Sequence, residues 1–324
     1  MQISRRAAVA LAVGTAAFLA ASAHAQNWPS KPIRMIVPFP AGGGTDMITR
    51  ELTNKLAGSG YTFVVENKPG SGGNLGVDAV AKAPADGYTL VMGQTSNLAI
   101  NPTLYARLPY DPVKDLTPVA RVADSPLVIV TATASPFKTL ADVVRVAKEK
   151  PGSINYATSG NGTVSHLAAE SFQRVAGITL THIPYKGAAQ GATDVMSGQV
   201  QLYVSTIPTL LGHIKSGKMR PIAVTSLKRV DDLKDVPTIA ESGYKGFESV
   251  TWFGILGPAR LPREIVAKLN ADINKALKDP QLEKQLSDQG ADVATGSPEQ
   301  FATLIRDDIP RWGKLVKDSG AKVD

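Results

Sequence analysis

The sequence predicts an α/β protein of two lobes, each built on a mostly parallel sheet flanked by helices. Apolar runs of strand length alternate with segments of helical period along most of the chain. A strand, a glycine loop and a helix occur twice, at 33–58 and 154–177, and in both copies Gly-Thr precedes the helix and Ala-Gly ends it. Two similar lobes explain this repeat. The alternative is a chance match between turn and helix-cap residues that are common in α/β proteins. The roughly 300 residues that follow the first segment also exceed one ordinary core.

That first segment, residues 1–25, has the pattern of a cleavable secretory signal. Arg5 and Arg6 precede an apolar run from 7 to 21, and Ala23-His24-Ala25 is a small-residue cleavage site. The apolar run is shorter than the roughly 20 residues of a membrane span. The twin-arginine route is the weaker alternative, because only Ser4-Arg5-Arg6 resembles its signal. We therefore expect a soluble protein of a bacterial periplasm.

Charge and cysteine content exclude several functions. The formal net charge of +7 loses two arginines on signal cleavage, and the remaining charges are interspersed. Nucleic-acid binding requires lysines and arginines clustered on one face, so it is not expected here. The chain has no cysteine, which excludes disulfides, thiolate metal sites and a lipid-anchoring cysteine after the signal.

The first glycine loop predicts an anion site. An apolar strand at 33–37 leads through Pro38 to Pro40 into three glycines, and Met47, Ile48, Leu52 and Leu56 then follow at helical spacing. Glycines allow a ligand close to the backbone, and the N–H groups of a helix start favour an anion. In the second loop, at 158–163, Ser165 stands where a dinucleotide fingerprint needs glycine, so an anion loop is the preferred interpretation there too.

The rest of the chain continues the alternation. We predict strands at 61–66, 88–92, 127–133, 154–157, 180–183, 200–204, 222–226 and 251–256. We predict helices at 75–83, at 140–150 and from 188 to about 197. We also predict a short helix that ends at 213–217 and a longer one with Pro262 in its first turn. The last helix starts at the capping-box pattern Ser297 to Gln300, and Pro310 is expected to end or kink it.

Polar residues gather where predicted strands end, in the loops at 94–97, 158–163 and 205–206. Ligands of parallel sheets bind beyond these carboxyl ends, so contact with a ligand competes with a plain turn-forming role. His166, in a first helical turn, either faces a ligand or caps a neighbour. Lys186 is either a cation for a carboxylate or a solvated surface lysine, and Asp46 either lines the site or complements the helix dipole. The histidines lack metal-pair spacing and no nucleophile elbow occurs, so a hydrolase is poorly supported.

Several motifs together resemble one family, the tripartite tricarboxylate transporter substrate-binding proteins, also called Bug receptors. The motifs are Trp28-Pro29 to Pro32-Ile33, Val37-Pro38-Phe39 to Gly42-Gly43-Gly44-Thr45-Asp46, Val65-Glu66-Asn67-Lys68-Pro69-Gly70 to Gly72-Gly73-Asn74, Ala85-Asp86-Gly87-Tyr88-Thr89-Leu90, Asn155-Tyr156-Ala157 to Gly162-Thr163, Pro184-Tyr185-Lys186-Gly187, Val236-Pro237-Thr238, Glu241-Ser242-Gly243 and Trp252-Phe253-Gly254. They span the whole chain after the signal.

The resemblance implies a hinged, type II-like "Venus flytrap" periplasmic binding protein without catalysis or cofactor. Such receptors hold a carboxylate between equivalent loops of the two lobes, partly through bridging waters. Carried over, the site comprises Phe39, Ala41, Gly42, Gly43, Gly44, Thr45, Asp46, Thr95, Ser96, Asn97, Ser159, Gly160, Asn161, Gly162, Thr163, His166, Tyr185, Lys186, Gly187, Ser205 and Thr206. Many relatives have an acidic residue near the position of Ser205, which suits an amino group, so its absence favours a di- or tricarboxylate or an aromatic carboxylate over an amino acid.

The implied organisation has lobe 1 at 26–125 plus 251–324 and lobe 2 at 126–250. The implied partners are a small carboxylate and the permease subunits of a tripartite tricarboxylate transporter, and we expect a monomer. The alternative role is a ligand-sensing subunit of a signalling system, which the same binding fold would serve. A secreted enzyme is a distant third.

Overall fold

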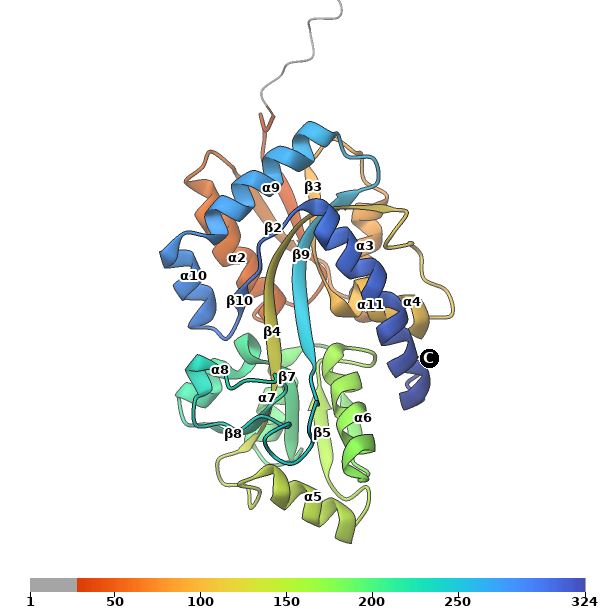
Figure 1. The fold of residues 1–324 in the computed structure, drawn as a ribbon, viewed down its shortest axis with the longest axis vertical. Coiled ribbons are helices and arrows are strands. Elements are labelled where there is room, and N and C mark those ends of the chain that lie inside the picture. Colours follow the sequence, from red (N-terminus) through yellow and green to blue (C-terminus); the bar gives the residue numbers. More distant parts are fainter. Residues whose placement is uncertain (1–27, 324) are drawn as a thin grey trace, which may run out of the picture.

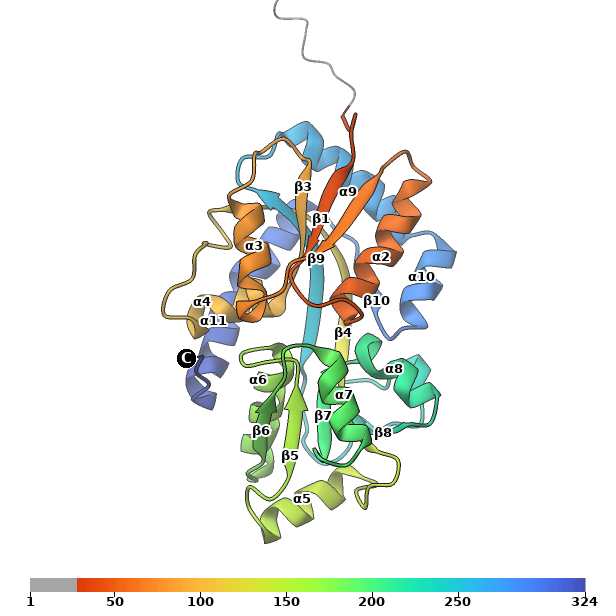
Figure 2. The ribbon, with the colours of Figure 1, turned by 180° about the vertical axis from the view of Figure 1, so that it is seen from behind.

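A computed structural model describes residues 28–323, so the predicted signal lies outside the described residues. The described chain forms two lobes, one above the other in Figures 1 and 2, and each has helices against a sheet. Eight strands follow one path, in the order β2 (Phe63–Asn67), β1 (Ile33–Val37), β3 (Thr89–Gln94), β9 (Val250–Pro258), β4 (Leu116–Ala132), β7 (Leu202–Thr206), β5 (Asn155–Thr158) and β6 (Thr181–Pro184). Two further strands, β8 (Met219–Val224) and β10 (Asp292–Val293), pair with β4 off this path. The two-lobed α/β fold predicted from the sequence is confirmed.

Lobe 1 has three parallel strands with β1 in the middle, and β9 runs antiparallel beside β3. Its elements are β1 (Ile33–Val37), α2 (Gly44–Ala57), β2 (Phe63–Asn67), α3 (Asn74–Ala81), β3 (Thr89–Gln94), the π-helical turn η2 (Ser96–Ile100), α4 (Asn101–Leu104), α9 (Arg263–Leu277), α10 (Pro280–Ser287) and β10 (Asp292–Val293). Ile48, Leu52 and Leu56 are fully buried on one face of α2. This four-residue repeat explains why the segment forms a helix against the sheet.

Lobe 2 repeats the pattern with β5 paired in parallel to β6 and β7. Its elements are α5 (Leu140–Glu149), β5 (Asn155–Thr158), α6 (Val164–Ala176), β6 (Thr181–Pro184), α7 (Ala188–Met196), β7 (Leu202–Thr206), α8 (Ile207–Lys215) and β8 (Met219–Val224). The sequence predicts one apolar face of α6 with Leu167, Ala168, Phe172 and Val175; the first three are buried, but Val175 is exposed, so the prediction was wrong there. The glycine loops before α2 and α6 therefore open toward each other from equivalent places in the two lobes (Figure 2).

Two long strands, β4 (Leu116–Ala132) and β9 (Val250–Pro258), pass between the lobes (Figure 1). They pair from Leu116↔Pro258 to Pro126↔Val250, and from Leu127 onward β4 pairs with β7 and β8 instead. This change of partner supports the lobe boundaries at 125/126 and 250/251, which stay a prediction.

The expectation of a strand only at 127–133 was wrong, because β4 begins at Leu116. The missed half contains Pro118, Arg121 and Asp124, which interrupt the apolar run. Pro118 lies at an irregularity in the pairing with β9, and Arg121 and Asp124 neutralise each other as an ion pair. Tertiary pairing with β9 thus overrides a weak local strand signal.

The last helix, α11 (Pro298–Ser319), begins with the predicted capping box: the Gln300 N–H donates to Ser297 Oγ and the Ser297 N–H donates to Gln300 Oε1. It runs through Pro310, so that residue does not end the helix. The part after Pro310 reaches lobe 2, where Asp318 Oδ2 lies 3.0 Å from Arg174 Nη1 of α6. None of the helices within residues 28–323 has the length and apolar character to cross a bilayer.

Candidate ligand-binding cleft

The cleft between the lobes contains an inner pocket of about 60 Å³, which is room for about five water-sized groups. It lies where the N-termini of α2 and α6 face each other. The predicted site residues that line it are Phe39, Gly43, Gly44, Thr45, Ser96, Ser159, Thr163, Gly187, Ser205 and Thr206. Its lining contains hydroxyl, amide and apolar side chains and no charged one.

A larger outer pocket of about 650 Å³ adjoins the inner one, because the two share Phe39, Pro40, Ser159, Thr163 and Gly187. Four further predicted residues of lobe 2 line it: Gly160, Asn161, Tyr185 and Lys186. The remaining predicted residues line neither pocket: Ala41, Gly42, Asp46, Thr95, Asn97, Gly162 and His166.

Each of the two helix N-termini is capped by a hydroxyl of the opposite lobe. The Gly44 N–H of α2 donates to Thr209 Oγ1 in lobe 2 at 3.1 Å, and the Val164 N–H of α6 donates to Ser96 Oγ in lobe 1 at 3.2 Å. These reciprocal bonds hold the lobes together. The next residues, Thr45 and Ser165, line the inner pocket, and their N–H groups have no acceptor among the described residues. Both N–H groups are therefore available to an anion at a helix start.

Asp46 stabilises the first glycine loop from behind. Its buried carboxylate accepts hydrogen bonds from the Gly42 N–H, from Arg50 Nε and from Asn67 Nδ2, each at 3.0 Å. Burial by itself would raise the pKa of Asp46, but the hydrogen bonds from Arg50, Gly42 and Asn67 outweigh it and hold this pKa below its ordinary value. The carboxylate is thus ionised and turned toward protein donors.

Thr95 and Asn97 are fully buried, so the expectation of a polar loop at 94–97 was wrong. Gln94 ends β3, and η2 starts at Ser96. Thr95 Oγ1 accepts the Trp252 N–H at 3.0 Å, which ties the end of β3 to β9. Asn97 Oδ1 accepts the Gln94 N–H at 3.0 Å. Both side chains fix the strand ends from which Gln94 and Ser96 reach the inner pocket.

His166 supports the second glycine loop. Its Nδ1 accepts the Gly162 N–H at 3.2 Å, and because an N–H can only donate, Nδ1 is unprotonated. The ring stacks on His182, with centroids 4.0 Å apart, and His182 stacks on Tyr156 at 4.9 Å. Burial, and then the neighbouring His166, lower the pKa of His182 to about 3. Burial also lowers the pKa of His166, although Glu170 opposes the effect.

His182, which is half-buried beside His166, predicts a pH dependence of stability. The folded-state pKa of His182 lies below its unfolded value of about 6.5. The contribution of this histidine to the free energy of unfolding is therefore complete above pH 6.5 and is lost as the pH falls toward 3. Between its folded and unfolded pKa values, one such histidine lowers the free energy of unfolding by at most about 1.4 kcal/mol per pH unit as the pH falls. Partial exposure of the ring narrows the pH range over which this happens. Urea denaturation between pH 7 and pH 4 should show a shallower loss for His182→Gln than for wild type. Parallel curves for both would contradict this assignment.

Glycines of the cleft make room for the opposite lobe. A Cβ on Gly162 would lie 1.7 Å from Leu104 Cδ2 of lobe 1, and a Cβ on Gly187 would lie 3.0 Å from Pro40 Cγ. A Cβ on Gly44 would lie 2.8 Å from Thr206 Oγ1 of lobe 2. A Cβ on Gly43 meets only the Pro40 carbonyl, at 3.8 Å. We expected a ligand to lie close to the backbone at these glycines. At three of them, Gly44, Gly162 and Gly187, the close neighbour is the opposite lobe of the protein.

The predicted site residues leave out eight residues that line the inner pocket, although the loop at 94–97 already includes the second of them: Pro40, Gln94, Val164, Ser165, Ala188, Thr209, Thr251 and Phe253. Pro40, Val164 and Ser165 are neighbours of predicted residues, and a wider window around each glycine loop would have included them. Thr251 and Phe253 belong to β9, and Thr209 lies in the first turn of α8. Phe253 belongs to the motif Trp252-Phe253-Gly254, but no local signal places any of these three in the cleft, because only the crossing of β9 and the contact between the lobes bring them there.

The pocket chemistry suits an anion held by neutral donors. Free N–H groups at two helix starts and the surrounding hydroxyls can donate to a carboxylate without a buried counter-charge. An ammonium group would find no carboxylate in this lining. Within residues 28–323, no cluster of three or more histidine, aspartate or glutamate side chains is arranged to hold a metal ion.

The fold and the cleft together define a two-lobed solute-binding protein. The family model described as the tripartite tricarboxylate transporter family receptor, TctC, matches residues 47–321, and the chain belongs to that family. Protein BugT of Bordetella pertussis is 38% identical over 319 residues, which cover 98% of each chain.

Two solved structures of Rhodopseudomonas palustris proteins are also similar. The first, solved with adipate, is 35% identical with a TM-score of 0.89, over 91% of this chain and 99% of that one. The second, MatC with bound malate, is 31% identical with a TM-score of 0.83, over 89% of this chain and 100% of that one. The recognition of the family from sequence motifs is confirmed.

Proposed function

We propose that this protein is a periplasmic receptor that captures a small carboxylate, a di- or tricarboxylate or an aromatic carboxylate, between its lobes. The observation that carries the proposal is the uncharged inner pocket with free N–H groups at two opposed helix starts, those of Thr45 and Ser165. The adipate and malate in the two R. palustris structures support the same ligand class. The lobes close because a ligand between them contacts both at once.

A thermal-shift screen of carboxylates tests this proposal. At about 100 times its dissociation constant, a bound ligand adds roughly 2.7 kcal/mol to the free energy of unfolding, which raises the melting temperature by several degrees. We expect stabilisation by at least one carboxylate and none by its primary amide, which has the same shape without the charge. Isothermal titration calorimetry then measures the affinity. Tight binding of an amino acid with no binding of any simple carboxylate would contradict the proposal.

The further step is delivery of the ligand to the membrane permease of a tripartite tricarboxylate transporter. Membership in the receptor family supports it, and so do the hydrogen bonds across the cleft, because they hold the two lobes in one arrangement that a partner can contact. Uptake of a labelled carboxylate should require both the receptor and the permease. Uptake that is undiminished without the receptor would contradict this step.

A further inference from the structure

Among the described residues that line the outer pocket, Lys186 is the one charged side chain. This lysine is exposed on the loop between β6 and α7, and it has no ion-pair partner among the described residues. Three neutral donors share the pocket, namely Ser71 and Tyr105 of lobe 1 and Asn161 of lobe 2, and their side chains have no hydrogen-bond partner within residues 28–323. Burial raises the pKa of Tyr105, so its phenol stays protonated and can donate. Among the described residues, the pocket thus presents one cation and several neutral donors, and no acidic side chain.

The two pockets form a continuous path. The inner pocket has room for a carboxylate group and a water or two, so a larger ligand must extend past the residues that the pockets share. Phe39 and Pro40 form the apolar part of this neck. An apolar neck between two donor-rich ends suits a ligand with a hydrocarbon spacer and an acidic group at each end.

From this arrangement, and resting on the proposed function, we infer that the ligand is an elongated dicarboxylate whose distal carboxylate binds Lys186 in the outer pocket. Its spacer is an alkyl chain or an aromatic ring in the neck. Lys186 belongs to lobe 2, whereas Ser71 and Tyr105 belong to lobe 1, so the distal carboxylate contacts both lobes as the proximal one does. A long ligand therefore favours closure at two places, and a compact hydroxy acid at only one.

Calorimetry with matched pairs of ligands tests the inference. Linear dicarboxylates from succinate to suberate are each compared with the monocarboxylate of equal carbon number, for wild type, Lys186→Met and Lys186→Arg. We expect at least one dicarboxylate longer than succinate to bind wild type about tenfold more tightly than its monocarboxylate partner. In Lys186→Met this ratio should fall to about one, and in Lys186→Arg it should be largely kept. Lys148→Met, which removes an exposed lysine of α5 at the far end of lobe 2, is the charge control.

The outcomes separate the two proposals. A dicarboxylate preference that persists in Lys186→Met, or an equal affinity for both members of every pair, overturns the role of the outer pocket. Tightest binding of succinate overturns the elongated ligand. Absence of binding by every carboxylate overturns the proposed function itself. A ratio that falls as much in Lys148→Met would assign the effect to net charge and also overturn the inference.

Discussion

Gly44→Ala is expected to weaken carboxylate binding at least tenfold and to leave the free energy of unfolding within about 1 kcal/mol of wild type. Gly44 is the first residue of α2, and a Cβ there would lie 2.8 Å from Thr206 Oγ1 and 3.4 Å from Thr209 Oγ1 of lobe 2. These hydroxyls are themselves 2.9 Å apart, so neither can rotate away without breaking their bond. The methyl group therefore holds the lobes apart, whereas alanine by itself favours the helix.

Calorimetry with a carboxylate found in the screen measures the affinity, and small-angle scattering measures the separation of the lobes. The matched control is Gly212→Ala in α8, a helical glycine whose Cβ would meet nothing within 4 Å. It should leave the affinity unchanged. Thr206→Ala removes the oxygen that collides, so the double variant should bind more tightly than the two single effects together predict. Full affinity in Gly44→Ala would show that the cleft does not close as the structure describes.

Most elements follow from the sequence because their signals are local. The repeat of Ile48, Leu52 and Leu56 predicts α2, and the capping-box pattern at Ser297 predicts the start of α11. The glycine loops mark the two strand ends at which the inner pocket forms. These predictions hold because burial of one helix face and satisfaction of helix-end N–H groups depend on neighbouring residues.

The parts that the sequence did not predict depend on contacts between the lobes. Gly44 and Val164 donate their N–H groups to Thr209 and Ser96, hydroxyls more than 60 positions away in each case. A helix start that the sequence predicts to be free for an anion is thus partly occupied, and a free N–H group lies one residue further on. The ring of His166 likewise stacks on His182 only because β6 places that residue against it. The spacing of residues along the sequence does not indicate which distant residues come into contact.

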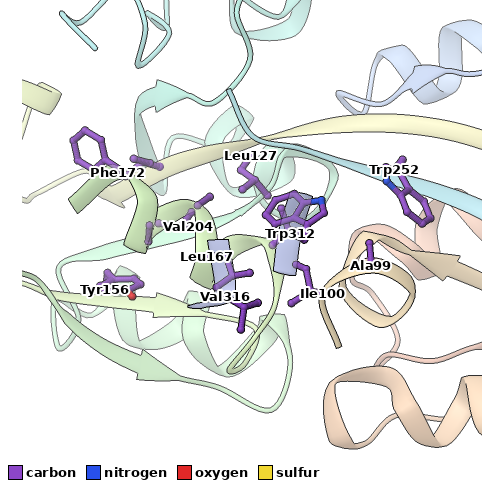
Figure 3. Close-up of a cluster of buried hydrophobic side chains, with 14 of the residues drawn as sticks. Ala99, Ile100, Leu127, Tyr156, Leu167, Phe172, Val204, Trp252, Trp312 and Val316 are labelled. Atoms are coloured by element: carbon purple, nitrogen blue, oxygen red, sulfur yellow. The ribbon is translucent and has the colours of Figure 1, made fainter. Parts of the chain in front are cut away.

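Trp312→Ala is expected to lower the free energy of unfolding by about 2–4 kcal/mol. Trp312 is 2% exposed in α11, in one apolar cluster with Ile100 of lobe 1 and Leu167 of lobe 2 (Figure 3). Truncating a buried tryptophan costs about 3–5 kcal/mol through lost packing and the cavity left behind. Part of this cost is offset, because the buried indole N–H has no acceptor among the described residues and alanine removes it. Urea denaturation at pH 7 measures the change.

Trp312→Phe separates the packing of the ring from its N–H group. Phenylalanine keeps most of the contacts between α11 and both lobes and removes the unpartnered donor, so its free energy of unfolding should stay within about 1 kcal/mol of wild type. A loss as large in Trp312→Phe as in Trp312→Ala would show that the indole N–H makes a hydrogen bond after all. A small loss in both would show that α11 is not part of the core that joins the lobes. With the expected pattern, α11 is a third connection between the lobes beside β4 and β9, made by packing rather than by the course of the chain.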